Sequence, residues 1–542
     1  MAPLLTTLLL VSCLFPQDLI TDPTELYLIK KEIHSLKSNK IQEELFLSPF
    51  VQKKPARNNP LNLIEYLDLK ELFKIEPIGS FRLSTSNFEM FPENSSALWL
   101  TPGLKLKSTI PIVNDLSSIW LYSWAEFHKH SAIFANSPMS IFPYKLFEYN
   151  PDYSMGFYTG SVGPNEGIDF DQSQAGVSIL SNNFEFVFGK FNTSFGPFTR
   201  GNLSLSNNAP PIEQIFIKLK HKKIIFSYLL GSLDSNIPKN TNFPEDGLYI
   251  DLWELDEFDI DLLDGNQLEG IRLPSYERYV AYHRLDFNIR NNIRIGAYEQ
   301  IIFGGRDIPT AYMIPVLPFW SSQHETGDLD NLMIGLDFDI LFGKKLNIKN
   351  RLYGSVLIDE WAPYSAFDRD DRNWFAYQLG YSRNGKILNK DLLYKMEYTR
   401  IGPRVYNHRF IINEPKHHGY NIGFWSGNHS DDFLMNLVMV LNSDRYIKLA
   451  YEFTRFSNAD FSEQIADLEN QYNNNYNLNF LGHGYNYRGK ISLTFSTLVK
   501  YGFFLDFELS SFNTKGLYSN GEFVEINQFE DMTVKIRYNI SK

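Results

Sequence analysis

The segment Leu332-Met333-Ile334-Gly335-Leu336-Asp337-Phe338-Asp339-Ile340 decides the fold. Apolar side chains occupy every second position from Leu332 to Ile340, and the carboxylates of Asp337 and Asp339 lie between them. Successive side chains of a β-strand point to opposite faces, so this spacing predicts a strand with one apolar face and one charged face.

The same alternation recurs along most of the chain, for example over residues 284–290, 394–399, 503–509 and 534–540. Half-buried strands of a soluble β-sandwich have the same period, so that class is the alternative. Three observations favour a transmembrane barrel. The strands reach about nine or ten residues, which is the length of a tilted membrane-crossing strand. Aromatic residues cluster near strand ends, as at membrane interfaces, and an apolar export segment precedes the strands.

The composition excludes several further classes of protein and site. A net charge of −12 without a stripe of Lys and Arg argues against a nucleic-acid partner. After the N-terminal region the sequence has no apolar run of the roughly 20 residues that a spanning helix needs. Cys13 is the one cysteine, so neither a disulfide within the chain nor a thiolate metal site can form. Stability must then come from backbone pairing over a large area, as in a barrel.

We therefore predict an all-β, antiparallel transmembrane barrel over residues 77–542, preceded by a signal peptide and a small helical segment. At roughly 25 residues per strand and connection, this length gives about 16 to 20 strands. Two long irregular stretches, residues 131–176 and 232–275, are expected to be loops outside the cell or folded into the lumen. The second stretch has an acidic centre from Glu245 to Asp264.

The N-terminal 76 residues have a different pattern. Residues 1–21 contain the short apolar run Leu4–Phe15 and are interpreted as a signal peptide, in which Leu10–Cys13 resembles a lipobox and makes Cys13 a lipidation candidate. Residues 22–76 are predicted to be a helical periplasmic segment. Asp22-Pro23-Thr24-Glu25 is a capping pattern for a first helix, and a second helix is expected from Asn59-Pro60 to Pro77.

Charged residues on the inward side of the predicted strands and their turns are the candidates for a polar lumen network. They are Arg284, Glu299, Arg306, Asp307, Asp337, Asp339, Asp359, Glu360 and Glu397. One interpretation is an ion network that plugs the barrel and holds its shape, because opposite charges on neighbouring strands stabilise a sheet. The other is a polar channel or a wall that hydrogen-bonds sugar hydroxyl groups.

A second group of residues is suited to contact a glycan, through aromatic stacking or charged hydrogen bonds. It comprises Trp320, Trp361, Trp374, Asp368, Arg369 and Arg372, although a tryptophan near a strand end equally suits the lipid interface. Asp359 and Glu360 have the residue types of a glycosidase pair, but neighbours on a strand diverge. We predict no catalytic residue, no metal site and no cofactor, apart from divalent cations that bridge acidic groups.

From Gly189 to Arg455 the sequence resembles the bacterial capsule-assembly Wzi family. The motifs that carry the resemblance appear in the expected order: Gly196-Pro197, Leu203 to Pro211, His283-Arg284-Leu285, Tyr298-Glu299, Asp330-Asn331, Asp359-Glu360, Glu397-Tyr398-Thr399, Tyr406, His418-Gly419 and Gly427. The resemblance implies an outer-membrane barrel of about 18 strands with a helical part on its periplasmic side.

The function expected from this resemblance is non-enzymatic binding or organisation of capsular or other surface polysaccharide at the outer membrane of a diderm bacterium. The other expected partners are outer-membrane lipid and the barrel-assembly machinery. The alternative is a porin-like diffusion channel, and the third hypothesis is an outer-membrane enzyme that modifies lipid or glycan.

Overall fold

The structure is a computed structural model. It describes residues 25–41, 73–84, 97–113, 119–134, 159–161, 167–181, 183–238, 275–325, 327, 329–343, 349–360, 373–408, 410–418, 420–457, 480–481, 485–499, 503–515, 517–519, 522–524 and 528–539. The predicted signal peptide with Cys13, most of the predicted second helix and the acidic stretch Glu245–Asp264 lie outside these residues.

The described chain is built almost entirely of strands. They are β1 (Phe73–Ser84), β2 (Ala97–Val113), β3 (Ile119–Phe134), β4 (Thr159–Ser161), β5 (Gly167–Leu180), β6 (Phe184–Phe191), β7 (Ile212–His221), β8 (Ile224–Pro238), β9 (Ser275–Arg290), β10 (Ile293–Gly304), β11 (Asn331–Phe342), β12 (Lys349–Glu360), β13 (Trp374–Ile387), β14 (Lys390–Ile401), β15 (Lys416–His417), β16 (Tyr420–Asn421), β17 (Ser430–Asn442), β18 (Arg445–Ser457), β19 (Tyr485–Leu498), β20 (Phe503–Lys515), β21 (Leu517–Ser519), β22 (Glu522–Val524) and β23 (Gln528–Asn539). The helices are α2 (Glu25–Ser38), α5 (Thr310–Met313) and α6 (Phe319–Glu325), with a 3-10 turn η6 (Ile411–Asn413).

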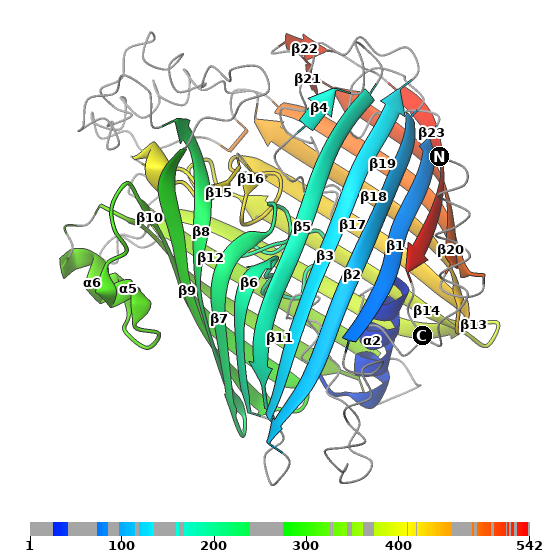
Figure 1. The fold of residues 1–542 in the computed structure, drawn as a ribbon. Coiled ribbons are helices and arrows are strands. Elements are labelled where there is room, and N and C mark those ends of the chain that lie inside the picture. Colours follow the sequence, from blue (N-terminus) through cyan, green and yellow to red (C-terminus); the bar gives the residue numbers. More distant parts are fainter. Residues whose placement is uncertain are drawn as a thin grey trace.

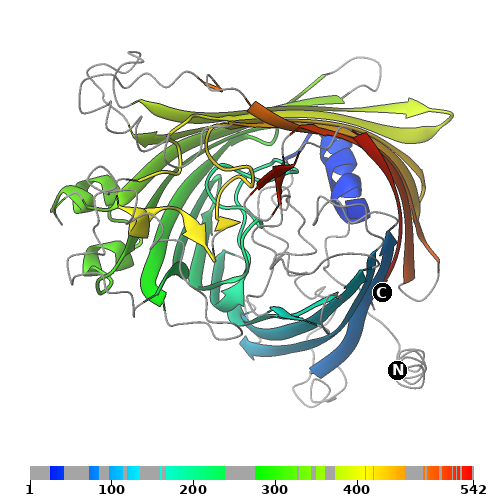
Figure 2. The same ribbon diagram turned by 90° about the horizontal axis from the view of Figure 1, so that it is seen from above.

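The main sheet closes on itself. Strand β1 pairs antiparallel with β2 on one side and with β23 on the other, and every step between them around the ring is also antiparallel. Of the 19 strands in this sheet, all but β4, which pairs only with β5, belong to the ring. Figures 1 and 2 show the resulting barrel from the side and from above. The predicted all-β antiparallel barrel is confirmed, and the 18 strands of the ring lie within the expected range.

The two faces of the wall differ as the alternation predicts. On β11, the outward side chain of Leu336 is 55% exposed, whereas the inward carboxylate of Asp339 is 0% exposed. A soluble protein buries its apolar residues and exposes its charges. The reversed distribution means that the apolar face looks outward and the charged face encloses the interior.

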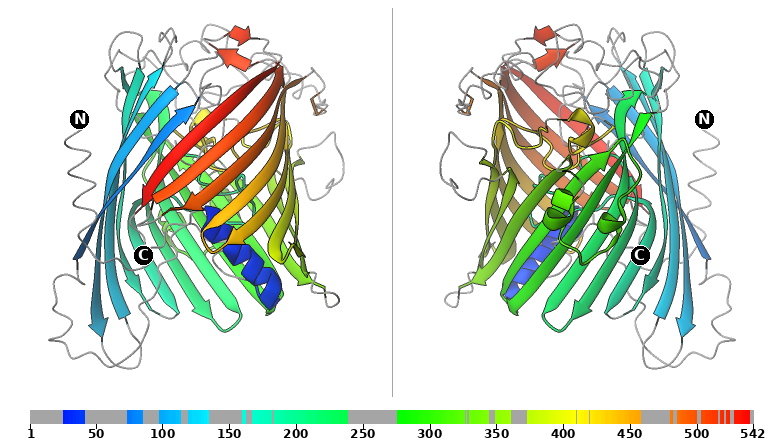
Figure 3. Two further views of the ribbon diagram at one scale, coloured as in Figure 1. Left: turned by 90° about the vertical axis from the view of Figure 1, so that its right-hand side faces the viewer. Right: turned by 90° about the vertical axis from the view of Figure 1, so that its left-hand side faces the viewer.

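The two ends of the barrel have different connections. At one end, short turns such as residues 222–223 and 388–389 join consecutive strands. At the other end the connections are long, and two of them, residues 192–211 and 402–429, fold back into the lumen (Figure 2). A third, residues 305–330, carries α5 and α6 down the outside of the wall (Figures 1 and 3).

Helix α2 was expected in a periplasmic segment, but it lies inside the lumen near the short-turn end (Figures 2 and 3). Its apolar residues Leu26, Ile29, Ile33 and Leu36 pack against inward side chains of the wall, including Leu393 and Val438. The predicted apolar face of the helix is therefore confirmed, and it is buried against the barrel wall. No helix among the described residues has the length and hydrophobicity to cross a membrane.

Four boundaries differ from the sequence analysis. Strand β1 begins at Phe73, before the expected boundary at 77. Pro77 was expected to end a helix, but it lies inside this strand. Strands β3 and β5 extend to Phe134 and from Gly167, and β8 extends to Pro238, into stretches that were expected to be loops. Gly, Pro and Tyr in these stretches suggested irregular structure, but the strands of this barrel continue beyond the bilayer thickness.

We expect Ile33→Ala to weaken the docking of α2 by about 2 to 4 kcal/mol, because it leaves a cavity against the barrel wall. Proteolysis of α2 in the folded, detergent-solubilised protein measures this loss. Leu28→Ala is the matched control, since Leu28 is 41% exposed on the same helix. Equal cleavage rates in the two variants would contradict the packing described above.

Candidate functional site

Residues 192–211 and 402–429 enter the lumen from the long-connection end, and together we call them the plug. Phe195, Leu203 and Leu205 of the first segment pack with Ile422 and Phe424 of the second, all of them buried. The two segments also share a backbone hydrogen bond, from Ser206 N to Ile422 O at 2.8 Å. The plug is thus one packed unit rather than two independent loops.

Tyr406 holds the two segments of the plug and the wall together. Its backbone N–H donates to Asp359 Oδ2 on β12 at 2.5 Å, and its hydroxyl donates to Leu203 O at 2.5 Å. The same hydroxyl accepts the N–H of Phe424 at 3.2 Å. Burial raises the pKa of the Tyr406 hydroxyl, which keeps the proton it donates. Asp359, a predicted lumen residue, is therefore a structural acceptor.

Two further plug residues bind wall carboxylates. Glu397 on β14 accepts hydrogen bonds from Thr199 N at 2.9 Å and Thr199 Oγ1 at 3.0 Å, as well as from Tyr353 Oη at 2.7 Å. Arg200 Nε lies 3.0 Å from Asp432 Oδ2, and its guanidinium also pairs with Glu452. Burial opposes the charge of Arg200, yet the two carboxylates hold its pKa above the ordinary value. The plug is thus bound to the wall by hydrogen bonds at Glu397 and by ion pairs at Asp432 and Glu452.

Below the plug, the inward charges of β9 to β11 form a buried cluster. Asp286 lies between two guanidinium groups, 2.8 Å from Arg284 Nη2 and 3.0 Å from Arg294 Nη2, and Arg284 also pairs with Asp337. Gly296 makes room for this cluster, because a Cβ atom there would lie 2.3 Å from Arg284 Nη2. Charges taken out of water are tolerated only when paired and hydrogen-bonded, as they are here.

Helix α2 completes a second cluster at the short-turn end. Arg351 Nη2 lies 2.9 Å from Asp339 Oδ2, and Arg351 Nη1 lies 3.3 Å from Glu32 Oε1 on the helix. Lys395 Nζ contacts the other oxygen of Glu32 at 2.6 Å. Burial favours the protonated acid, but Lys395 and Arg351 hold the pKa of Glu32 below its ordinary value. The helix thus supplies an anion that Arg351 and Lys395 share, in addition to the wall carboxylate of Asp339.

The structure brings five of the predicted lumen residues into this interior: Arg284, Asp337, Asp339, Asp359 and Glu397. The sequence analysis missed four other charged residues of these clusters: Asp286, Arg294, Arg351 and Lys395. These residues also point inward from their strands, so the alternation of inward and outward positions could have identified them. The sequence analysis also missed Glu32 and Arg200. No local pattern marks these two, because they reach the wall from a helix and a loop.

Glu299, Arg306 and Asp307 were expected in the lumen network, and the structure places them elsewhere. Tyr298 faces the interior, so its neighbour Glu299 faces outward, where its Oε2 accepts Phe319 N–H at 2.7 Å and lies 2.8 Å from His283 Nε2. Arg306 follows the end of β10 and pairs with Asp330 at 2.5 Å, and Asp307 beside it is exposed. The side chain of Glu360 lies outside the described part of the chain.

The predicted glycan-contact residues are not brought together by the described structure. Trp320 lies on α6 outside the barrel and is 58% exposed. Trp374 begins β13 and packs against the plug, with the guanidinium carbon of Arg404 at 5.7 Å from its ring centre. Trp361, Asp368, Arg369 and Arg372 belong to residues that the structure leaves undescribed. Within the described chain, no cluster of three His, Cys, Asp or Glu residues has the geometry of a metal site.

Comparisons with known proteins give a family and a fold. The family model described as Capsule assembly protein Wzi matches residues 146–497, more than half of the chain. No curated protein matches the chain. A solved structure of Wzi from Escherichia coli, reported as an outer-membrane protein of group 1 capsule assembly and a carbohydrate-binding β-barrel, is 11% identical, covers 97% of this chain and 100% of its own, and has a TM-score of 0.54.

Two other solved structures have lower scores. Acinetobacter baumannii OccAB4 is 8% identical, covers 86% of this chain and 97% of its own, and has a TM-score of 0.44. Pseudomonas aeruginosa OprD is 8% identical, covers 87% and 93%, and has a TM-score of 0.44. At these identities and scores the comparison with E. coli Wzi establishes the fold alone, and the other two structures support no inference.

The lowered pKa of Glu32 makes the docking of α2 sensitive to acid. Its ion pairs contribute fully above the ordinary value of 4.5 and are lost as the pH falls through the lower pKa of the folded state. We expect hydrogen–deuterium exchange of α2, corrected for the intrinsic rate, to increase below pH 4.5. Glu32→Gln should exchange faster at neutral pH and respond less to acid. An unchanged pH response in this variant would exclude Glu32 as its source.

Arg200→Met should destabilise the folded barrel by about 3 to 5 kcal/mol, because it leaves the carboxylates of Asp432 and Glu452 without their shared cation. Urea unfolding in detergent measures the change. Lys37→Met is the control, since its pair with Asp391 is largely exposed and should cost less than about 1 kcal/mol. Adding Asp432→Asn to Arg200→Met should recover part of the loss, and no recovery would argue against the pairing.

Proposed function

The chain belongs to the capsule assembly protein Wzi family, and on that premise we propose that it is a non-enzymatic outer-membrane protein that binds and organises capsular or other surface polysaccharide. The family match is the observation that carries this proposal. The closed barrel with an apolar exterior supports the membrane location, since closure is how a sheet satisfies its backbone in lipid. In such barrels the short turns face the periplasm and the long connections face outward.

The interior supports a plugged barrel over a diffusion channel. The side chain of Arg351 is only 1% exposed, and Asp339, Arg284 and Asp286 are similarly buried. In an open pore, water would reach the charges that line the wall. Here they contact each other, helix α2 and the plug, so no observation on the described residues favours the channel hypothesis.

The same contacts support the absence of catalysis. A glycosidase needs two carboxyl groups free to face one substrate. Asp359 instead accepts the N–H of Tyr406, and Glu397 accepts hydrogen bonds from Thr199 and Tyr353. The acidic residues of the interior thus bind the protein itself, which leaves the glycan to surface groups.

Glycan contact is then assigned to the long-connection end, which faces the cell exterior. The chain carries a net charge of −12, so an acidic polysaccharide would be repelled overall. Arginine side chains, aromatic stacking or bridging divalent cations would provide the attraction. Outer-membrane lipid and the barrel-assembly machinery are the other proposed partners, and no nucleic acid is involved.

The refolded protein should bind purified polysaccharide of the strain that produces it. If divalent cations bridge the acidic groups, addition of a chelator should weaken this binding, and added calcium should restore it. Isothermal titration or glycan-array binding measures the effect, with an unrelated outer-membrane barrel as the control. Failure to bind with and without chelator would contradict the proposal.

Conductance separates the proposal from the channel alternative. The plugged barrel should produce no steady pores in planar bilayers, whereas large steady conductance would favour a channel. Release of surface polysaccharide from a deletion strain, with the protein located by membrane fractionation, tests the same role in cells.

A further inference from the structure

The barrel wall has a notch at the strands that lead into the plug. Strand β6 has 8 residues and β7 has 10, whereas their neighbours β5 and β8 have 14 and 15. Strand β6 covers only residues 175–180 of β5, and β7 covers only residues 224–232 of β8. The short pair ends partway up the wall because its connection turns into the lumen (Figure 1).

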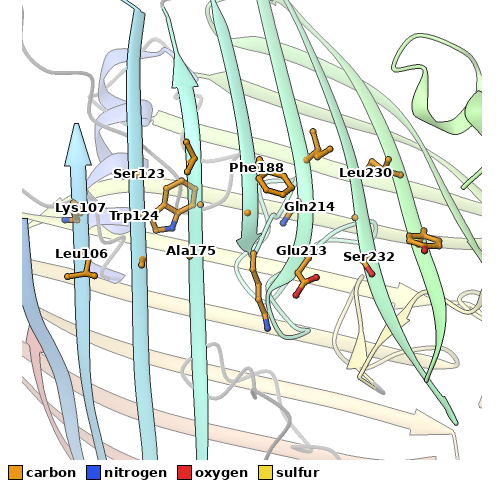
Figure 4. A pocket seen from close by; sticks show the side chains of 18 of the residues that line it. Leu106, Lys107, Ser123, Trp124, Ala175, Phe188, Glu213, Gln214, Leu230 and Ser232 are labelled. Atoms are coloured by element: carbon orange, nitrogen blue, oxygen red, sulfur yellow. The ribbon is translucent and has the colours of Figure 1, made fainter. Parts of the chain in front are cut away.

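A groove of about 740 Å³ lies on the outer face at this notch (Figure 4). Twelve of its lining residues have the outward parity of their strands, and the other strand residues, such as Lys107, Trp124 and Gln214, have inward parity and lie next to them in the sequence. Eight of the outward residues form two rows that cross the wall. They are called lower and upper with the short turns at the bottom, as in Figure 1, whereas Figure 4 shows the barrel inverted. In the lower row, Val177, Phe188, Ile215 and Leu230 stand directly opposite one another on β5 to β8. This row is wholly apolar.

The upper row explains why the surface is hollow. Ala175, Lys190, Glu213 and Ser232 stand opposite one another across the same strands. Ala125 on β3 faces Ala175, so small side chains flank a central pair of opposite charges. The Lys190 ammonium and the Glu213 carboxylate are the last outward groups of β6 and β7 before the chain turns inward.

The protein segment beside the groove also has the character of a lipid contact. Ile308 lines the groove, and residues 308–323, which run along the outside of the wall, include no Asp, Glu, Lys or Arg. Met313, Val316 and Trp320 of this segment are exposed although apolar. Exposed apolar side chains suit contact with acyl chains, and Trp is enriched at the level of the lipid headgroups.

We propose that this groove binds one acyl chain of a membrane lipid from the surrounding bilayer, with Lys190 and Glu213 at its upper rim holding the polar end of that chain. The inference rests on the proposed outer-membrane location, because only there does the outer face meet lipid.

The chemistry of the groove matches such a ligand. The apolar row would contact methylene groups, and a groove left empty would forfeit those contacts. Lysine can lay its stem along an apolar surface and direct its ammonium to a polar group. Here it would donate to an ester or phosphate oxygen, while Glu213 balances its charge. Lys190 and Glu213 carry opposite charges at directly opposed positions, which explains why two ionisable residues are tolerated beside the apolar row.

The test uses the full chain in nanodiscs of palmitoyl-oleoyl phosphatidylethanolamine and phosphatidylglycerol, followed by native mass spectrometry. Wild-type protein should retain one phospholipid after the nanodisc is removed. The double variant Ala175→Leu and Ser232→Leu, which fills the groove, should lower the fraction of lipid-bound barrels about tenfold or more, equivalent to 1.4 kcal/mol. Ala297→Leu is the matched control: Ala297 lies on β10 between outward Leu285 and Leu336, away from the groove, and this variant should behave as wild type.

Lys190→Met should partly lower the fraction of barrels that retain the phospholipid, and Lys190→Arg should preserve it. The two variants therefore test the polar contact separately from the packing of the acyl chain in the groove. Circular dichroism confirms that each variant is folded. Equal retention by wild type and the filled variant would overturn the groove proposal, even if polysaccharide binding is normal. Failure of wild-type protein to enter nanodiscs would instead overturn the membrane location on which both proposals depend.

Discussion

The constraint on which this structure depends is that every strand of the ring must find a backbone partner on both sides. A sheet with a free edge exposes unpaired N–H and C=O groups, which lipid cannot satisfy. Pairing of β1 with both β2 and β23 removes that edge. Once the ring is closed, the period of two divides its side chains between an apolar exterior and a polar interior, and the remaining features follow from how that interior is filled.

Filling the interior is mainly an electrostatic problem. The wall presents charges such as Arg284, Asp337 and Asp339 to a space where water has little access. Some charges are paired by neighbouring strands, as Asp286 is by Arg294. Others receive partners from elements that enter the lumen: Glu32 comes from α2, and the plug supplies Arg200. The same elements bring apolar residues, so packing and ion pairing are achieved together.

In this barrel, α2 and the plug are bonded to the wall at several points. These interior contacts leave the connections at the long-connection end as the part of the barrel proposed to contact the glycan. The plug also has a cost for the wall, because the chain that forms it leaves β6 and β7 short. The groove lies on the outer face where these two strands end, so the inward turn of the chain that forms the plug also shapes the surface proposed to contact lipid.

The sequence by itself determined the class of fold, the two faces of each strand and the helix at Glu25–Ser38, because period and capping are local properties of the chain. It also identified Arg284 and Asp337 as inward charges. The tertiary structure alone decided that Glu299 accepts a hydrogen bond from Phe319, that α2 lies in the lumen, and that Arg200 binds Asp432. These depend on strand parity within a closed ring and on contacts between segments up to hundreds of residues apart. The residue type and the local alternation predict the charge of a side chain and the face it occupies. Only the closed barrel determines which residue forms an ion pair or hydrogen bond with it.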